Sequence, residues 1–424
     1  MAKTVPLDGS TLAWARAQFA RYYRSATIDP PDRLARREFA AFPFAEANVM
    51  RRHATLPTPG ELGAYLREVV PRHVYYSSAY YRLPAEPTMA AKGWLGADLI
   101  FDLDADHLRG ASELDYAGQL ALVKSRLLDL VDDFLVRDFG VSAASTSFVF
   151  SGGRGYHVHV RDEQFLTLSG PERREIVDYV LGTGVDPLAA VEEHREDVRA
   201  GRTVGGADAE EPDGGPRGRP MRTVRLAGPN APGWKGRTTR AVLAVLARWE
   251  RDGAASAAGE MERWGLARAK ARRFARLLLE RGRAERIRSS LSLDVFGRGE
   301  SPKEFLEAVV RGAAVEVQAE TDAPVTTDIH RLIRLPGSLH GGTGLRVVPL
   351  AREEVERFDP FRDAVVDGAG EERATPVTFL EEVRYPFPGG GLHGVAGSTD
   401  ELPRPRALFL VLRGEAALRP SPGG

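Results

Sequence analysis

The sequence predicts a mixed α/β fold with a helical insertion, and three features support this class. A strongly apolar run with acidic residues set into it lies at 97–106, and stretches rich in β-branched and aromatic residues lie at 145–150 and 156–160, as is typical of strands. Apolar residues recur at helical spacing over 117–138, as in a helix that packs on a core. Residues 238–290 are rich in Ala, Arg and Leu, which favours a run of helices outside the sheet.

A chain of 424 residues is long enough for two or three domains. We expect residues 1–184 and 301–365 to form the two parts of the α/β core, with the helical insertion at 185–300 between them. We expect residues 366–424 to form a loop-rich C-terminal segment that ends in a disordered tail after about residue 414.

Composition excludes several classes of function. Hydrophobic residues make up 43% and charged residues 28% of the chain, and the net charge is -1, so no global basic field attracts nucleic acid. There is no Cys, which rules out disulfides, thiolate zinc sites and Cys-ligated iron–sulfur clusters in this chain. No signal-peptide pattern and no run of about 20 apolar residues is found, so we expect a cytoplasmic protein with no membrane partner.

The N-terminal part is predicted to alternate between helices and strands. We expect a helix at 10–25, a strand at 36–44, a short helix at 59–69 and β structure at 73–81. The four tyrosines of the last stretch have two interpretations. Amphipathic packing is the commoner one, and stacking on nucleic-acid bases is the other.

The middle of the chain is predicted to be mainly helical. We expect helices at 171–200 and over 238–290, where Trp249 and Trp264 are candidate anchors, and a Gly, Pro and acidic loop at 201–220. The positive charge at 268–286 favours a solvated helix face, and contact with nucleic acid is the alternative.

The first candidate site is the stretch 97–106, in which acidic residues alternate with apolar ones. On a strand, Leu99, Phe101 and Leu103 would face a core, and the other face would carry Asp98, Ile100, Asp102 and Asp104. A buried carboxylate is costly without a compensating charge, so Asp102 and Asp104 are candidate ligands of a divalent cation. The alternative is structural, with Asp102 solvated at a sheet edge and Asp104 at the end of the strand.

The second candidate site is a glycine-rich loop at 151–155. Its glycines permit close approach of backbone N–H groups to an anion, and Arg154 adds a charged, planar donor. His157 and His159 follow on one face of the next strand, where they could contact a phosphate or a metal. The alternative is a hairpin with a surface arginine and two partly buried histidines.

The third candidate site is 321–344, where aspartates, arginines and histidines surround a short apolar element. Asp322 and Asp328 are six positions apart, so alternation along a strand does not choose between them as a ligand. Pro324 favours extended backbone before it, which suits a ligand at Asp322, whereas Asp328 is placed to cap a short helix.

Taken in this order, the three clusters resemble the small catalytic subunit of the archaeo-eukaryotic DNA primases, in its archaeal form. The resemblance rests on Asp102-Leu103-Asp104, on the run from Ser151 to His157, and on Asp322 followed by the run from Arg331 to His340. Arg37-Glu38-Phe39 is similar to the N-terminal pattern of that family. The similarity covers roughly residues 10–350.

The resemblance implies a primase core with an RNA-recognition-like catalytic sheet. It implies an enzyme that makes short primers from nucleoside triphosphates on a single-stranded DNA template for replication. It also implies that Asp102, Asp104 and Asp322 hold two Mg²⁺ or Mn²⁺ ions for nucleotidyl transfer. The nucleotide-binding set implied is Ser151, Gly153, Arg154, His157, Arg334 and His340.

The resemblance has two further implications. The family usually carries a zinc module after the first cluster, but this chain has no Cys and only His107 as a candidate histidine in 105–140, so no zinc is expected. Membership would also imply a heterodimer with a primase large subunit that bears an iron–sulfur cluster.

Three other functions remain open. A repair-type primase-polymerase of the same superfamily would share the three clusters. A non-catalytic single-strand-binding module would need stacking aromatics and basic residues, but has no use for convergent aspartates. A phosphoesterase built on His157 and His159 would hydrolyse a phosphodiester rather than extend it.

Overall fold

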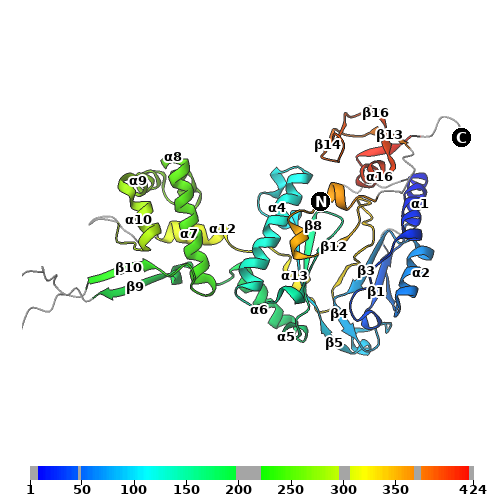
Figure 1. Cartoon of the computed structure of the whole chain (residues 1–424), viewed down its shortest axis with the longest axis horizontal. Coiled ribbons are helices and arrows are strands. Elements are labelled where there is room, and N and C mark those ends of the chain that lie inside the picture. Colours follow the sequence, from blue (N-terminus) through cyan, green and yellow to red (C-terminus); the bar gives the residue numbers. More distant parts are fainter. Residues whose placement is uncertain (1–7, 46–48, 197–220, 296–305, 367–373, 420–424) are drawn as a thin grey trace, which may run out of the picture. The chain divides into compact units, whose positions relative to one another are not determined.

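The computed structural model describes residues 8–45, 49–196, 221–295, 306–366 and 374–419. The chain divides into two compact units, one formed by residues 1–181 and 319–424 and the other by residues 182–318. Figure 1 shows the helices and strands of both units. The predicted mixed α/β class is confirmed, because helices and several separate sheets are present.

One sheet of the first unit carries the first two clusters. It has four antiparallel strands in the order β12-β7-β8-β6. They are β6 (Leu99–Asp104), β7 (Thr146–Phe150), β8 (Gly155–Val160) and β12 (Val348–Leu350). In the pairing of β6 with β8, Asp102 lies opposite His157 and Asp104 opposite Gly155. The acidic strand and the glycine-rich loop are therefore at the same end of the sheet.

The helix predicted at 117–138 packs on that sheet. It consists of α4 (Tyr116–Asp129), which contacts β6 and β8, and a π-helical continuation, Leu130–Val136. Its buried side chains, among them Leu120 and Val123, recur at the spacing that predicted the helix. Asp115 caps its first turn by accepting from the N–H of Gly118 at 2.7 Å.

A second antiparallel sheet, in the order β11-β3-β1-β2, brings the third cluster beside the N-terminal strands. Its strands are β1 (Phe39–Phe42), β2 (Arg51–Ala54), β3 (His73–Ser77) and β11 (Leu332–Arg334). Arg334 on β11 lies opposite Tyr75 on β3. Helices α1 (Gly9–Ser25) and α2 (Pro59–Val69) bury Phe19 and Leu62 in a core that also contains Ile100 of β6. The two sheets therefore share one core.

The elements predicted for the N-terminal part are confirmed by α1, β1, α2, β3 and β4 (Ala79–Tyr81). β4 pairs with β5 (Trp94–Ala97), and α3 (Met89–Lys92) lies between them in sequence. Tyr76, Tyr80 and Tyr81 are all buried, which supports packing and not stacking on bases. The shorter helices of this unit are α5 (Glu163–Leu166), α6 (Gly170–Leu181), α13 (Ala323–Thr327), α14 (Arg352–Val355) and α15 (Pro360–Asp363).

The prediction of a loop-rich segment over 366–424 is wrong for residues 374–419. They form β13 (Ala374–Phe379), β14 (Val383–Tyr385), β15 (Leu392–Gly394), β16 (Thr399–Pro403), α16 (Arg404–Arg413) and β17 (Ala416–Leu418). β13 pairs with both β16 and β17, and β14 pairs with β15. The three-residue strands β14, β15 and β17 are too short to show a period, and Pro403 and Pro405 read as turn signals although they stand at the start of α16. Residues 420–424 lie outside the described residues.

The second unit is mostly helical, with a β-hairpin that the sequence did not predict. The helix expected at 171–200 ends at Leu181, and β9 (Val191–Glu196) pairs with β10 (Met221–Leu226). Its main helices are α7 (Gly233–Asp252), α8 (Ala254–Arg263), α9 (Arg268–Leu279), α10 (Arg283–Ser290) and α12 (Arg311–Glu316). The loop predicted at 201–220 lies outside the described residues.

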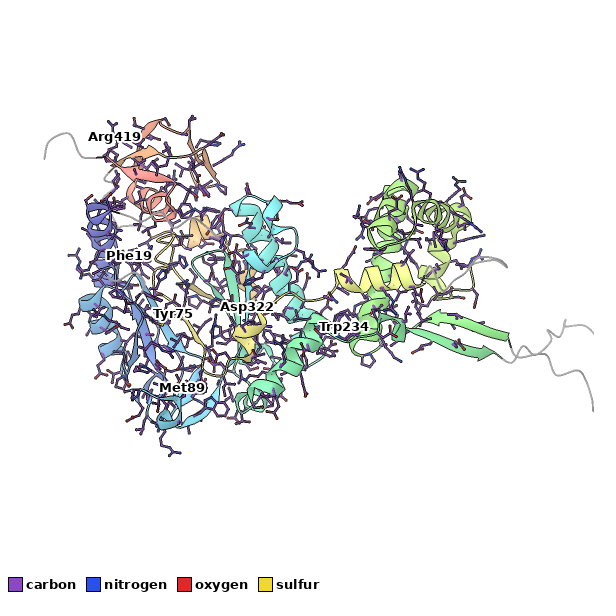
Figure 2. All side chains as sticks on the ribbon, turned by 180° about the vertical axis from the view of Figure 1, so that it is seen from behind. Phe19, Tyr75, Met89, Trp234, Asp322 and Arg419 are labelled. Carbon is purple, nitrogen blue, oxygen red and sulfur yellow. The ribbon has the colours of Figure 1, made fainter. Side chains whose placement is uncertain are left out.

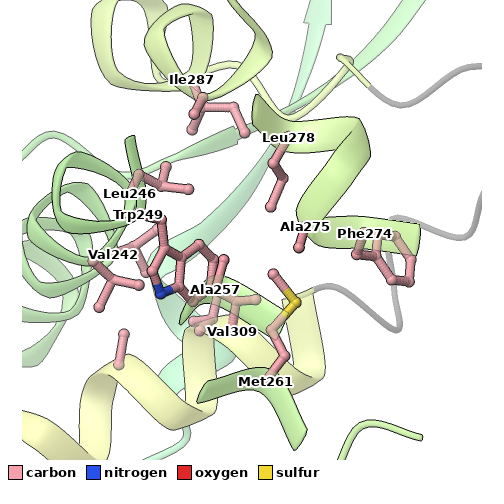
Figure 3. Packing of buried hydrophobic residues seen from close by; sticks show 14 of the residues in the cluster. Val242, Leu246, Trp249, Ala257, Met261, Phe274, Ala275, Leu278, Ile287 and Val309 are labelled. Carbon is pink, nitrogen blue, oxygen red and sulfur yellow. The ribbon is translucent and has the colours of Figure 1, made fainter. Parts of the chain in front are cut away.

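Trp249 is the centre of the core of this unit. Its ring is fully buried and lies 5.7 Å from that of Trp264. Figure 3 shows Trp249 among Val242, Met261 and Leu278. The unit begins at Gly182 and extends to Gln318, so the described residues 306–318 belong with this helical unit and not with the core in which we expected them.

In the described part of the chain no helix is both long and apolar enough to span a membrane.

Candidate active site

Asp102 and Asp322 come from distant parts of the chain and lie next to each other. The backbone N–H of Asp322 donates to the carbonyl oxygen of Asp102 at 2.8 Å, and Thr321 Oγ1 donates to the same oxygen at 3.1 Å. Asp322 immediately precedes α13, but its side chain does not cap that helix. Its carboxylate is therefore available for another role. Figure 2 labels Asp322 at the start of α13 and Tyr75 on β3.

The electrostatics of Asp102 reflect this neighbour. Burial, and next the negative charge of Asp322, raise the pKa of Asp102 to about 6. Burial also raises the pKa of Asp104, two positions along the same strand face. Arg331 and Arg334 act on Asp102 in the opposite direction without cancelling the shift. When two half-buried carboxylates repel each other, a cation that binds between them stabilises their charged forms.

The donor set of this site fits Mg²⁺ or Mn²⁺, which prefer carboxylate oxygens. Asp102 and Asp104 supply oxygens from β6, and Asp322 supplies them from the start of α13. Among the described residues, no three acidic, histidine or cysteine side chains are already gathered as a complete metal site. Mg²⁺ is commonly held by one or two protein carboxylates together with phosphate oxygens and water, so it does not require that all three carboxylates be gathered in advance.

Asp328, the other candidate for the third carboxylate, has a structural role. It lies at the C-terminal end of α13, and its Oδ1 accepts from the N–H of His330 at 2.9 Å. The residue is exposed. The side chain thus closes the turn after a helix, whereas the sequence suggested that it would cap the beginning of one.

His157 is a neighbour of Asp102. Its Nε2 lies 3.4 Å from Oδ1 of Asp102. Burial, and then the positive charge of Arg334, lower the pKa of His157 to about 3, so the ring is neutral at pH 7. A neutral, buried ring brings no positive charge to a triphosphate, but it can orient the carboxylate. His159 is fully buried, and its ring stacks on Tyr76, so it belongs to the core.

The glycine-rich loop at 151–155 folds tightly against the turn that follows His340. Gly152 has a φ of 75°, and a Cβ there would lie 2.7 Å from the Cβ of His340, so glycine is required. The buried Ser151 Oγ accepts from the N–H groups of Gly153 and Gly155, both at 3.3 Å. Ser151 therefore shapes the loop from inside. Of the described loop amides, those of Gly152 and Arg154 are left for an anion.

Arg154 lies between this loop and the carboxylates. Its guanidinium forms an ion pair with Asp106, just after β6, and its backbone carbonyl accepts from the N–H of Ala105 at 3.3 Å. Its charge lowers the pKa of Asp104, against the larger effect of burial. The side chain is 26% exposed, so a phosphate can reach it.

His340 presents an N–H donor to the loop. Gly342 N–H donates to His340 Nδ1 at 3.2 Å, from which we infer that the ring proton is on Nε2. A Cβ on Gly153 would lie 3.1 Å from that Nε2, so the donor lies over the glycine-rich loop. Burial, and then Arg334, hold the pKa of His340 well below its usual value. His340 is therefore a neutral donor.

His73 is a site residue that the sequence did not reveal. Arg334 Nη1 donates to His73 Nδ1 at 2.6 Å, and the N–H of Gly341 donates to the same nitrogen at 3.3 Å. The ring of His73 meets that of His340 edge to face, with centroids 5.2 Å apart. His73 thus ties β11 to the His340 turn. A single histidine at the start of a strand, far from Arg334 in sequence, carries no motif that would have found it.

Two further residues that the sequence did not reveal donate hydrogen bonds to backbone carbonyls of the glycine-rich loop. Tyr116 Oη donates to the carbonyl of Gly153 at 2.6 Å, and Thr343 Oγ1 donates to the carbonyl of Gly152. Arg334 also lies over the ring of Tyr75, 5.2 Å from its centroid. The three predicted clusters are therefore joined by side chains from β3, α4 and the turn at 340–344.

We expect Asp102→Asn to stabilise the metal-free protein near pH 8. The folded-state pKa is about 6 against 3.8 for an unperturbed Asp. The charged form therefore weakens the fold by up to about 3 kcal/mol. The destabilisation reaches its full size above the pKa of Asp102 in the folded protein, and it disappears as the pH falls below the pKa of Asp102 in the unfolded chain. Thermal melts in the presence of a chelator should show a higher melting temperature for the variant than for the wild type near pH 8, and a smaller difference near pH 4. A variant that melts below the wild type near pH 8 would contradict the raised pKa of Asp102.

Comparison with known proteins bears on the same residues. The sequence model of the DNA primase small subunit family matches residues 101–352, which include Asp102, Asp104 and the whole of the second and third clusters. The DNA primase small subunit PriS of Methanocella arvoryzae is 38% identical over 98% of this chain and its own whole length. PriS of Methanothrix thermoacetophila is 38% identical over 97% of this chain and 99% of the relative. PriS of Natronomonas pharaonis is 40% identical over 85% of this chain and 86% of the relative.

The family model matches more than half of the chain, and the relatives align over most of it. Together these matches assign the chain to a family. The chain belongs to the DNA primase small subunit family.

Proposed function

We propose that this protein synthesises short oligonucleotide primers from nucleoside triphosphates on single-stranded DNA, for DNA replication, by two-metal nucleotidyl transfer. Membership of the DNA primase small subunit family supports the reaction class. The observation that carries the chemistry is the contact of Asp102 with Asp322, which places two mutually repelling carboxylates beside a loop suited to phosphate.

Asp102, Asp104 and Asp322 would hold the two cations. When bound, divalent cations would neutralise negative charge on the triphosphate and activate the attacking hydroxyl. The role of His157 is to keep the carboxylate of Asp102 in one orientation, through the 3.4 Å contact of Nε2 with Oδ1.

The triphosphate would lie between the glycine-rich loop and the His340 turn. Arg154 and Arg334 offer positive charge from the two sides, and His340 Nε2 and the amide of Gly152 offer N–H donors. Arginine suits this task because its fork of N–H groups matches phosphate oxygens. His73 keeps Arg334 pointing to the same place by accepting from Nη1 at 2.6 Å.

The structure weakens two of the alternatives. A phosphoesterase centred on His157 and His159 would need both rings at the site, but His159 is fully buried against Tyr76. A module that only binds single strands would use exposed aromatics, but Tyr76, Tyr80 and Tyr81 are buried. A repair-type primase-polymerase remains the second candidate, because it would use the same carboxylates.

We further propose that the protein works as a heterodimer with a primase large subunit. The small-subunit family to which it belongs supports a partner of this kind. The chain has no Cys, so an iron–sulfur cluster in the complex would have to be held by the partner.

The experiment that tests the function supplies the purified protein with single-stranded template, labelled nucleotides, and Mg²⁺ or Mn²⁺, in parallel reactions without and with an annealed primer. Products made without a primer support the primase. Extension of the annealed primer alone would favour the repair-type polymerase. Template binding with no incorporation in either reaction, also after addition of the large subunit, would overturn the enzymatic assignment.

Arg154→Ala should raise the apparent KM for nucleoside triphosphate and lower kcat by about tenfold each, since loss of one phosphate contact costs about 1.4 kcal/mol per step. Arg154→Lys should restore part of this loss, because a lysine gives charge but no fork. Steady-state kinetics and template affinity, measured on the same preparations, separate the two roles. A fall in template affinity with unchanged nucleotide kinetics would make Arg154 a nucleic-acid contact.

A further inference from the structure

The near-zero net charge of the chain conceals a separation of charge between the two units. Residues 182–318 contain 25 basic and 20 acidic residues, whereas the rest of the chain contains 33 basic and 39 acidic residues. The excess within 182–318 is concentrated at 263–288, which has ten basic and two acidic residues. A local basic excess in a neutral chain is the charge pattern of a site for a polyanion.

Helix α9 presents this charge on one side. Its apolar side chains Ala271, Phe274, Ala275 and Leu278 are buried, and Figure 3 shows Phe274, Ala275 and Leu278 facing the core of the unit. At 100° per residue, Arg272, Arg273 and Arg276 fall on the opposite side, and all three are exposed. We call these three arginines the α9 basic face. The core packing of the helix needs none of them.

Ion pairs with described residues do not account for Arg272 and Arg276, two members of the α9 basic face. Elsewhere in the unit, Arg248 pairs with Glu260 at 2.8 Å, and Arg288 pairs with Glu250. Arg272 and Arg276 have no carboxylate within ion-pair distance among the described residues. They are also four positions apart, where like charges repel each other and destabilise a helix. Their placement therefore weakens the isolated fold.

We propose that the α9 basic face binds the phosphate backbone of single-stranded DNA. Arginine is the side chain best suited to phosphate oxygens. Arg272 and Arg276 are separated by about 6 Å along the helix axis, which covers about two phosphates of one strand. The exposed residues of α9 are Arg, Lys and Ala, so the face lacks the large apolar side chains that a membrane surface would take up.

This binding surface is separate from the catalytic assignment. It lies in residues 182–318, whereas the three carboxylates lie in the other unit. A protein inactivated by Asp322→Asn should therefore bind single-stranded DNA through the α9 basic face as well as the wild type does. Failure of primer synthesis in the wild type would leave this result unchanged, so the two proposals fail independently.

The test measures fluorescence anisotropy of a labelled single-stranded oligonucleotide of about 30 nucleotides with the full-length chain, over a range of salt concentrations. The variant Arg272→Gln/Arg276→Gln should bind several-fold more weakly. Its plot of log affinity against log salt should be shallower by about 1.4, since each lost phosphate contact contributes about 0.7. The matched control is Arg16→Gln/Arg24→Gln, which removes the same charge from exposed positions of α1.

Equal losses in both double variants, or an unchanged salt slope, would overturn the proposal. Both pairs lie on exposed helix positions, so neither variant should melt below the wild type. Sedimentation with vesicles that contain phosphatidylserine tests whether the α9 basic face binds an anionic membrane instead of DNA. Vesicle binding that depends on Arg272 and Arg276, with DNA binding unaffected, would assign the face to a membrane instead.

Discussion

Asp322→Asn is expected to reduce nucleotide incorporation to below about one-hundredth of the wild-type rate, an increase in the barrier of about 2.7 kcal/mol. The loss should persist at every Mg²⁺ or Mn²⁺ concentration, because an amide replaces a charged oxygen ligand. Asp322 contacts the backbone of Asp102, and its side chain makes no cap on α13, so the fold should tolerate the change. A metal titration of primer synthesis, beside melting curves, measures both effects.

Asp328→Asn is the matched control for this variant. It makes the same chemical change six positions away, at the other end of α13, where Asp328 is exposed and accepts from His330 N–H. It should keep most activity and lose about 1 kcal/mol of stability at most. An inactive Asp328 variant beside an active Asp322 variant would reverse the assignment of the third carboxylate. Retention of more than about a tenth of the activity by Asp322→Asn, a barrier change of only about 1.4 kcal/mol, would remove Asp322 from the metal site.

The parts of the fold that the sequence predicted well are those with a long periodic pattern. α1, α4 and the helices from 233 to 290 show apolar residues at helical spacing, β6 is an apolar run interrupted by aspartates, and β7 and β8 are rich in β-branched and aromatic residues. The β9–β10 hairpin was missed because its strands carry many charged residues, and β14, β15 and β17 were missed because they have only three residues each. Such strands are defined by their pairing partners, which local sequence does not specify.

Some residues of the candidate site could be predicted from local sequence, and others could not. Asp102, Asp104, Arg154 and Asp322 stand in runs whose residue types by themselves suggest metal and phosphate chemistry. The contact of Asp102 with Asp322 depends on the return of the chain after 318, which spacing cannot predict. His73, Tyr116 and Thr343 act through hydrogen bonds to residues brought near by the fold, so no local pattern marks them.

Ser151 and His157 show how an expected role changes with burial. Both lie in the loop and strand that resemble a phosphate site, but Ser151 Oγ is occupied by the amides of Gly153 and Gly155. His157 is neutral at pH 7 because burial lowers its pKa to about 3. Residue type predicted that both take part in the site. Whether a side chain faces the ligand or supports a neighbour depends on packing, which the residue type alone does not give.

Arg37→Met is expected to destabilise the fold by about 3–5 kcal/mol, because it leaves the charge of Asp98 buried without its main partner. Arg37 and Asp98 are both 0% exposed, and Arg37 Nη2 lies 2.9 Å from Asp98 Oδ2. The same guanidinium also donates to the carbonyl oxygens of Ser77 and Ser78. Arg161 Nε, 3.6 Å from Asp98, supplies only part of the lost charge.

The charge of Asp98, and not the lost volume of Arg37, should be the larger cause of that destabilisation. If so, Arg37→Met/Asp98→Leu should be more stable than Arg37→Met alone, because no buried charge is left unpaired. Arg36→Met, at the exposed neighbouring position, should change stability by less than about 0.5 kcal/mol. Denaturant melts of the three variants measure these differences. A double variant no more stable than Arg37→Met would show instead that the hydrogen bonds of Arg37 to Ser77 and Ser78 dominate.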